Sequence, residues 1–181
     1  MDTKYRLLFL TYSYLERVAW FVMDLLPPFP RNILLRLILG SCGSNCLIDY
    51  GVYFRYPWRI HLGDGVSINR KCQFYPSLSN SSIRIESGAI LGPNVKIYAA
   101  GQDPNDPQLG DIAADVTIGP RVYLGGDSIV RYGVRIHADA VVGAGAVVVN
   151  DLPSGGIYAG VPARRMQFRP IDGVSPDADG H

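Results

Sequence analysis

The sequence contains few cysteines, few histidines and almost no net charge, and each scarcity excludes a class of protein. Three cysteines, an odd number, argue against a disulfide framework and favour a reduced, cytoplasmic protein. A net charge of +1, without a basic cluster, gives no support for nucleic-acid binding. Cys42 and Cys46 have no His or second Cys pair at ligand spacing nearby, so no metal site is expected.

Long hydrophobic runs are also missing from residues 1–40, although this segment is rich in apolar and aromatic side chains. Its longest stretch without a formal charge, Leu7 to Leu15, has nine residues, whereas a membrane-spanning helix needs about 20. No small-residue cleavage site follows a compact apolar core, which excludes a secretory signal. The segment predicts two amphipathic helices: one that ends at the prolines 27, 28 and 30, and one from Arg31 to Leu39. Two interpretations remain open: the helices lie in the inner face of the membrane, or they cap the repeat that follows or a neighbouring subunit.

What the sequence does contain, from residue 46 to residue 148, is a repeat of six. An α-helix has a period of 3.6 and an alternating strand a period of 2, so neither produces this pattern. A parallel β-helix does, because each short strand ends at a corner and the next strand repeats the same inward positions. The pattern gives fourteen rungs, or between four and five coils of three strands each. The inward aliphatic or aromatic residues of the rungs are Ile48, Phe54, Leu62, Ile68, Phe74, Ile85, Leu91, Ile97, Ile118, Leu124, Val130, Ile136, Val142 and Val148.

The repeat is interrupted three times. A bulge at 56–58 and a protruding loop at 76–81 account for the first two interruptions. The third is the longest, because residues 98–115 leave the coil altogether, and a loop of that length in a compact repeat is usually functional or disordered. We therefore expect an all-β protein with a parallel β-helix over 41–168, preceded by the helical segment 1–40 and followed by a flexible tail, 169–181.

Two stretches of the repeat resemble a known family. They are YPWRIHLGDGVSINRKC, residues 56–72, and GVRIHADAVVGAGAVVVNDLPSGGIYAGVPARRM, residues 133–166. Both look like segments of the left-handed β-helix (hexapeptide-repeat) acyltransferases, and within them of the polysaccharide and sugar O-acetyltransferases, including the colanic-acid and maltose/galactoside branches. The resemblance covers about residues 25–168. It implies acetyl-CoA as acyl donor, a sugar acceptor, and a homotrimer whose active sites lie between neighbouring coils.

The resemblance also places the general base, a histidine, on the long loop, where this sequence has Gln102 followed by Asp103. A neutral amide cannot take a proton from a sugar hydroxyl. Three explanations stay open. Asp103 or another group is the base; the protein is an inactive member of the family; or Gln102 only orients the hydroxyl, and proximity supplies a slower transfer.

The remaining candidates follow from the same resemblance. Asn69 matches a residue that contacts the acceptor or the reacting centre, and Tyr123 matches one that flanks the acceptor site. Asn69 also fits a polar corner residue in left-handed backbone geometry. Asn150 stands where the family has a lysine, which removes one expected phosphate contact. The residues expected to contact CoA are Gly125, Gly126, Gly143, Ala144, Arg164 and Arg165.

Three histidines complete the candidates. His61 is expected on the surface, His137 at a corner that could border the groove, and His181 in the tail. A γ-type carbonic anhydrase is excluded, because it needs three zinc-binding histidines around one groove. The sequence thus predicts an O-acetyltransferase for a surface polysaccharide or its lipid-linked sugar precursor. The second hypothesis is a catalytically silent trimer that binds CoA or a glycan, or that scaffolds a biosynthetic complex.

Overall fold

The computed structural model describes residues 3–169, and of residues 3–6, 8 and 9 only the backbone. Most of the expected tail, including His181, lies outside the described residues. The chain divides into two compact units, one of residues up to Leu37 and one of residues from Ile38 onward.

The first unit consists of two helices, α1 (Thr3–Leu25) and α2 (Pro28–Ile38). The prediction that the prolines end the first helix and precede the second was wrong in one respect, since Pro28 and Pro30 lie in the first turn of α2. Proline is well suited to that position, because the first helical N–H groups have no partner within the helix. None of the helices in the described part of the chain combines the length and hydropathy that crossing a bilayer requires.

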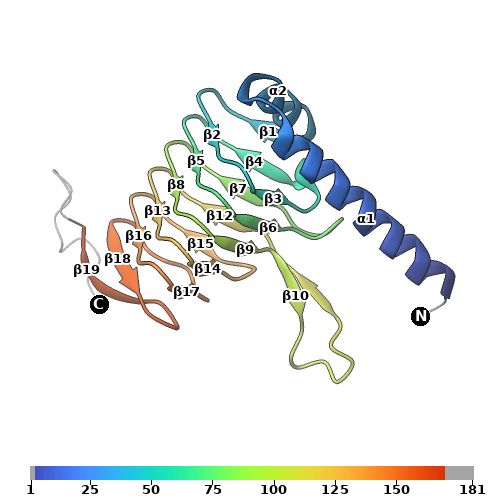
Figure 1. Cartoon of the computed structure of the whole chain (residues 1–181). Coiled ribbons are helices and arrows are strands. Elements are labelled where there is room, and N and C mark those ends of the chain that lie inside the picture. The colour runs from blue at the N-terminus through green and yellow to red at the C-terminus, as the bar shows by residue number, and fades with distance from the viewer. Residues whose placement is uncertain (1–2, 170–181) are drawn as a thin grey trace. The chain divides into compact units, whose positions relative to one another are not determined.

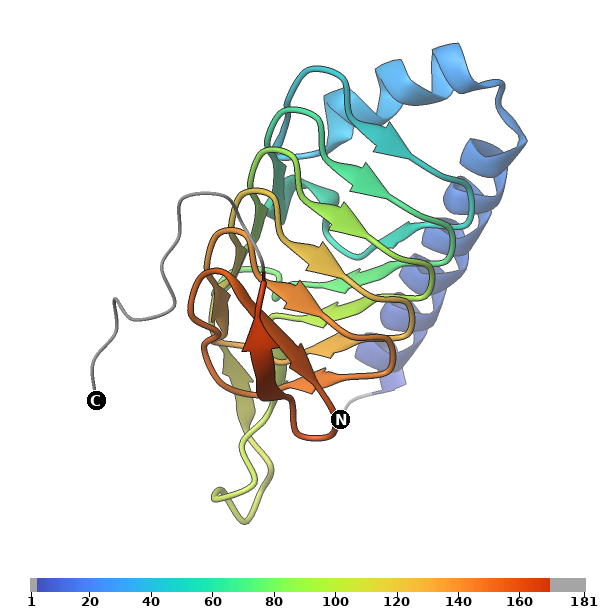
Figure 2. The ribbon, with the colours of Figure 1, turned by 90° about the vertical axis from the view of Figure 1, so that its left-hand side faces the viewer.

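The second unit is the β-helix. The strands of its coil form three sheets, which we call A, B and C and which are parallel except for the last strand of sheet B; Figure 2 shows the strands of each sheet stacked behind one another. Sheet A contains β1 (Ser41–Cys42), β4 (Ile60–Leu62), β7 (Ile83–Ile85), β12 (Val116–Ile118) and β15 (Arg135–Ile136). Sheet B contains β2 (Leu47–Ile48), β5 (Ser67–Ile68), β8 (Ile90–Leu91), β13 (Tyr123–Leu124), β16 (Val141–Val142), β18 (Gly156–Ala159) and β19 (Arg164–Phe168). Sheet C contains β3 (Tyr53–Phe54), β6 (Gln73–Tyr75), β9 (Lys96–Tyr98), β14 (Ile129–Val130) and β17 (Val147–Val148).

The repeat of six is confirmed at every rung within the described residues, since each of the fourteen predicted positions lies on a strand. From Phe54 to Val148 these inward side chains are at most 3% exposed and fill the centre of the coil. Phe54 and Phe74, for example, stack with ring centroids 4.9 Å apart. Burial of this continuous apolar column drives the fold. The last coil ends differently, because β19 turns back and pairs antiparallel with β18.

The interruptions also have a defined structure. The bulge at 56–58 is a short 3-10 helix (Pro57–Arg59), entered through Tyr56 in left-handed geometry. The long loop is a hairpin of β10 (Ala100–Gln102) and β11 (Asp111–Ala113), which projects from the coil between β9 and β12 (Figure 1). Tyr98, expected to have left the coil, still lies in β9 opposite Tyr75, with which it stacks at 5.0 Å. The projecting part is therefore shorter than 98–115.

Candidate active site

The hairpin β10–β11 carries the residue that stands in place of the expected histidine. Its strands pair antiparallel, with Gln102 directly opposite Asp111. Residues directly opposite in such a pair project to the same face, with Cβ atoms about 4.5–5.5 Å apart. Both side chains are exposed. The hairpin therefore presents an amide and a carboxylate side by side to the solvent.

Asp103 and Asp106 shape the tip of this hairpin. Asp103 Oδ1 accepts hydrogen bonds from the backbone N–H of Asn105 at 2.9 Å and from its side-chain amide at 3.2 Å. Asp106 accepts from the N–H groups of Gln108 and Gly110, both at 2.9 Å. Hydrogen bonds of this kind hold a turn in one conformation. Asp103 therefore stabilises the turn at the tip, in addition to the role of general base that the sequence suggested for it.

The base of the hairpin rests on Tyr132, at the corner between sheets C and A. A Cβ atom on Gly101 would lie 2.8 Å from Cε1 of the Tyr132 ring, so only glycine lets β10 approach the ring this closely. The guanidinium of Arg131 lies over the same ring, 4.3 Å from its centroid, and donates to the Tyr132 hydroxyl. This contact fixes the direction in which the hairpin leaves the coil.

The small residues expected to contact CoA lie on the corner between sheets B and C, one coil after another. Gly125 is buried there, and its Cβ would lie 2.5 Å from the Ala144 backbone N, so its lack of a side chain is explained by the stacking of the coils. Gly126 has more room, since its Cβ would be 3.3 Å from the Pro93 oxygen. Ala144 and Gly145 are exposed, and nothing lies within 4 Å of a Cβ on Gly145. Over residues 125–128 and 143–146 the corner is a ledge without bulky side chains, which we call the B–C ledge.

Asn69 and Tyr123 lie close to this ledge in the fold. Tyr123 projects outward from β13, opposite Ile90 and Val141, and is 42% exposed. Asn69 begins a corner of the ledge column, and its side-chain amide donates to the Leu91 oxygen of the next coil at 2.8 Å. The suggestion that Asn69 adopts left-handed geometry was wrong, because that geometry falls on Lys71, with φ 62°.

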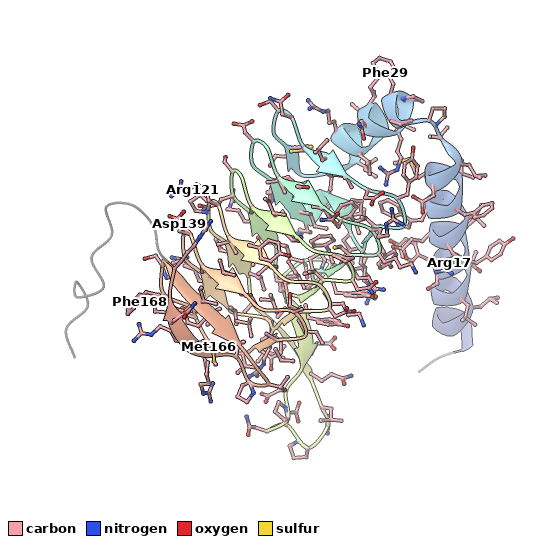
Figure 3. All side chains as sticks on the ribbon, turned by 60° about the vertical axis from the view of Figure 1, so that its left-hand side comes forward. Arg17, Phe29, Arg121, Asp139, Met166 and Phe168 are labelled. Carbon is pink, nitrogen blue, oxygen red and sulfur yellow. The ribbon has the colours of Figure 1, made fainter. Side chains whose placement is uncertain are left out.

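Arg164 and Arg165 follow one another on β19 and are both exposed. Successive residues of a strand point to opposite faces, so the two guanidinium groups contact different parts of the protein. Arg164 donates to the Ala163 oxygen at 3.0 Å, whereas Arg165 stacks on Phe168 at 4.5 Å. Met166 and Phe168 lie on the same strand (Figure 3). Asn150 is also exposed and follows β17, at the end of the sheet C strand that lies away from the B–C ledge.

Within one chain the candidates form two groups, which lie at opposite ends of the strands of sheet C. Strand β9 leads into the hairpin with Gln102, whereas the B–C ledge precedes the strands of sheet C. The structure thus brings Gln102 together with Asp111 and Asn69 with the ledge, but it does not bring Gln102 to the ledge. A reaction that needs both groups is incomplete in a single chain.

The cysteine and histidine side chains of the coil lie elsewhere. Burial raises the pKa of the Cys72 thiol to about 11, so this group is a core side chain and no nucleophile. His61 projects from sheet A and lies 3.2 Å from the Ser41 hydroxyl. His137 is exposed at the corner between sheets A and B, away from the B–C ledge. No group of three potential metal ligands occurs among residues 3–169.

Sequence reasoning missed two residues of the site, Asp111 and Tyr132. Asp111 could have been found only from the pairing of the hairpin, which the sequence does not state. Tyr132 gave no clear signal in the sequence, since the corner between sheets C and A carries an aromatic residue in another coil as well, Tyr56.

Comparison with known proteins assigns the class. A protein of Saccharomyces cerevisiae named as an acetyltransferase, YJL218W, is 33% identical over 138 residues, which are 74% of this chain and 68% of that protein. Nodulation protein L of Rhizobium meliloti is 36% identical over 136 residues, 74% of this chain and 73% of that protein. The crystal structure of a maltose O-acetyltransferase from Clostridium difficile 630 has a TM-score of 0.78 at 27% identity and covers 91% of this chain and 89% of its own. No family profile matches the chain.

The fold and these relatives define an acyltransferase built on a left-handed β-helix. The chain belongs to the hexapeptide-repeat acetyltransferases.

Proposed function

We propose that the protein transfers the acetyl group of acetyl-CoA to a hydroxyl of a sugar that belongs to a surface polysaccharide or to its lipid-linked precursor. The observation that carries the proposal is the B–C ledge with Arg164 near its end, on the fold of the family. Relatives named for such acceptors support it. A galactoside O-acetyltransferase of Escherichia coli is 29% identical, and so is WcaF of the same species, which is named for colanic acid biosynthesis.

The residues of the ledge fit the donor. Pantetheine is a thin, extended chain, and the exposed Ala144 and Gly145 leave its path clear. Arg164 offers a guanidinium to a CoA phosphate, for which its planar donors are well suited. The solved galactoside acetyltransferase that contains coenzyme A has a TM-score of 0.76 at 26% identity, covering 84% of this chain.

The reaction needs a base beside the acceptor. The sugar oxygen attacks the thioester carbon, a C–O bond forms and the C–S bond breaks, and the hydroxyl proton leaves the sugar and ends on the CoA thiol. Gln102 cannot take this proton, but the carboxylate of Asp111, directly opposite, can. Gln102 then holds the hydroxyl in position by hydrogen bonds. Since a carboxylate is a weaker base than an imidazole, transfer is slower than with a histidine.

We assign the active form to a homotrimer. The hairpin and the ledge lie at opposite ends of the strands of sheet C. One complete site therefore combines the hairpin of one subunit with the ledge of its neighbour. Variants mixed in one oligomer test this: a chain with a damaged hairpin and a chain with a damaged ledge regain activity only together.

Helix α1 supports a peripheral position on the cytoplasmic face of the membrane. Six of its exposed apolar and aromatic side chains recur every three or four positions and thus form one stripe, whereas Tyr12, Leu15 and Val22, which are also exposed, lie outside it. The stripe consists of Leu7, Leu10, Tyr14, Val18, Phe21 and Leu25. Sedimentation with vesicles of phosphatidylglycerol and phosphatidylethanolamine tests the proposal, with Phe21→Glu expected to release the protein and Arg17→Gln as the control for charge.

The experiment for the function is acceptor-dependent release of the CoA thiol, with mass spectrometry of the sugar product. We expect one acetyl group on an oligosaccharide. Binding of acetyl-CoA without any transfer, across neutral and acidic acceptors, would instead support the silent trimer.

A further inference from the structure

The outward face of sheet A carries a row of polar side chains, one from each strand. They lie directly opposite one another in the sheet, as the strand registers show. The row consists of Ser41, His61, Arg84, Thr117 and Arg135. The corresponding row of sheet B is mostly apolar, with exposed Leu47, Ile90 and Tyr123. The outward face of sheet A is therefore a polar surface that follows the coil axis.

Two hollows lie along this row and form one groove. Their volumes are about 380 and 390 Å³, within the range of small-molecule sites. They share Arg84, Glu86 and Pro120, so the wall between them belongs to both. The first extends to Ser41 and His61, and the second to residues 135–138. The shared wall joins them into what we call the sheet A groove.

Two arginines of the groove have no acidic partner. Arg84 and Arg135 are exposed, and neither forms an ion pair within the described residues. Arg59 nearby is engaged, since it donates to the oxygens of Leu78 and Ser79.

Three carboxylates lie in the same region, and one of them, Asp151, accepts a hydrogen bond from the backbone N–H of Arg135 at 2.7 Å. Asp115 binds the N–H and hydroxyl of Ser82, while Glu86 lies between the two hollows. At His61, the positive charges of the neighbouring arginines outweigh the negative charge of Asp115. Burial lowers the pKa of its imidazole most, the charges of Arg84 and Arg59 lower it further, and Asp115 opposes them. The groove is thus suited to an anion.

We propose that the sheet A groove binds an acidic oligosaccharide, whose carboxylate or phosphate groups pair with Arg84 and Arg135. These arginines stand two strands apart, about 10 Å, so an extended ligand with repeated acidic groups matches them better than a single ion. A guanidinium binds either anion through paired N–H donors. That the ligand is a carbohydrate rests on the proposed function, and the groove then defines the acceptor as an acidic polymer.

The position of the groove relative to the hairpin suggests how a bound polymer takes part in acetyl transfer. The hairpin with Gln102 rejoins the coil just before Val116, the first residue of β12, and Thr117 of that strand lines the groove. The hairpin meets sheet A at the N-terminal ends of its strands, and the groove extends to their C-terminal ends, where Glu86 and Pro120 line it, so an extended polymer is needed to reach from one to the other. A polymer held in the groove keeps its hydroxyl groups at high local concentration near the hairpin.

Calorimetric titration without acetyl-CoA tests the proposal independently of catalysis. The ligands are an oligogalacturonate, a phosphorylated oligosaccharide of similar length and neutral maltoheptaose. We expect the native protein to bind at least one acidic sugar and Arg84→Gln/Arg135→Gln to bind it at least tenfold more weakly. The matched control, Arg17→Gln/Arg36→Gln, removes the same charge from exposed positions of the helices and should bind normally. Comparison of the two acidic sugars tells carboxylate from phosphate.

Several results would overturn the proposal: no binding of either acidic sugar, equal binding of maltoheptaose, or an equal loss in the control. Binding of single-stranded DNA of the same charge, with the same dependence on the two arginines, would overturn the assignment to carbohydrate. A second measurement follows the His61 signal by NMR, where a bound acidic sugar should raise the pKa of the imidazole. Transfer to a small neutral sugar should persist in the Arg84 and Arg135 variant, which separates this proposal from the proposed function.

Discussion

Gln102 and Asp111 lie directly opposite one another in the antiparallel hairpin β10–β11. The resemblance to the family assigns the catalytic base to the position of Gln102, and the pairing of the hairpin supplies a carboxylate beside it. The loss of the histidine therefore does not leave the hairpin without a group that can accept a proton.

The first prediction concerns this carboxylate. Asp111→Asn should lower kcat about a hundredfold, the lower end of what a general base contributes, without changing the affinity for acetyl-CoA. Asp103→Asn is the discriminating variant, because Asp103 is the alternative base and also holds the hairpin tip. Steady-state kinetics of both variants decide between them. A larger loss in Asp103→Asn, with an unchanged hairpin by NMR, would assign the base to Asp103.

The second prediction concerns the seat of the hairpin. Gly101→Ala places a Cβ atom 2.8 Å from the Tyr132 ring and should push β10 away from the coil. A shift of about 1 Å can reduce a rate a hundredfold, so we expect at least a tenfold lower kcat. Thermal stability and acetyl-CoA binding should change little, since the hairpin lies outside the core. An unchanged kcat would show that the Tyr132 contact does not position the hairpin.

The third prediction separates two neighbouring glycines of the B–C ledge. Gly125→Ala should destabilise the fold by about 1–3 kcal/mol, since its Cβ would lie 2.5 Å from the backbone of the next coil. Gly126→Ala should cost less, because its nearest neighbour is 3.3 Å away, and should mainly weaken acetyl-CoA binding. Urea denaturation and calorimetry measure the two effects. Equal destabilisation by both variants would contradict this division.

The sequence was sufficient for the coil because one physical requirement repeats along it. Every rung needs an apolar inward side chain, so Ile118, Leu124 and Val130 mark their strands without any knowledge of distant contacts. The site was less accessible. Asp111 faces Gln102 only because the chain turns back after an eight-residue tip, 103–110, and no periodic pattern encodes that pairing.

The prolines and glycines show a second limit of the sequence. Pro28 looked like the end of a helix and in fact begins one, since proline suits both places. Gly125 was expected to contact CoA, and the structure explains its lack of a side chain by the close approach of Ala144. Residues with several physical uses are assigned only when their neighbours are known.

The fourth prediction concerns acid stability. Arg121 and Asp139 meet on the corner between sheets A and B (Figure 3), where Nε donates to Oδ1 at 2.7 Å and Nη2 to Oδ2 at 2.6 Å. These hydrogen bonds lower the pKa of Asp139. The pair therefore stabilises the fold above the unfolded value of about 3.9, and this contribution is lost as the pH falls through the lower folded pKa.

Asp139→Asn should accordingly lower the urea midpoint at pH 7, and the difference from the native protein should shrink as the pH falls below about 4. Asp127→Asn is the matched control, since Asp127 is also a corner residue in left-handed geometry and, unlike the half-buried Asp139, is exposed. A difference that stays constant from pH 7 to pH 2 would show that the ion pair is not its cause.

The most direct test of the account compares acetyl transfer by the native chain and by Gln102→His, with the sugar product detected by mass spectrometry. The account predicts slow transfer by the native chain and a rate on the order of a hundredfold higher in the variant, since Asp111 would orient the new imidazole. If both chains bind acetyl-CoA and neither transfers its acetyl group to any sugar, the protein is a silent member of its family and the proposed function is wrong.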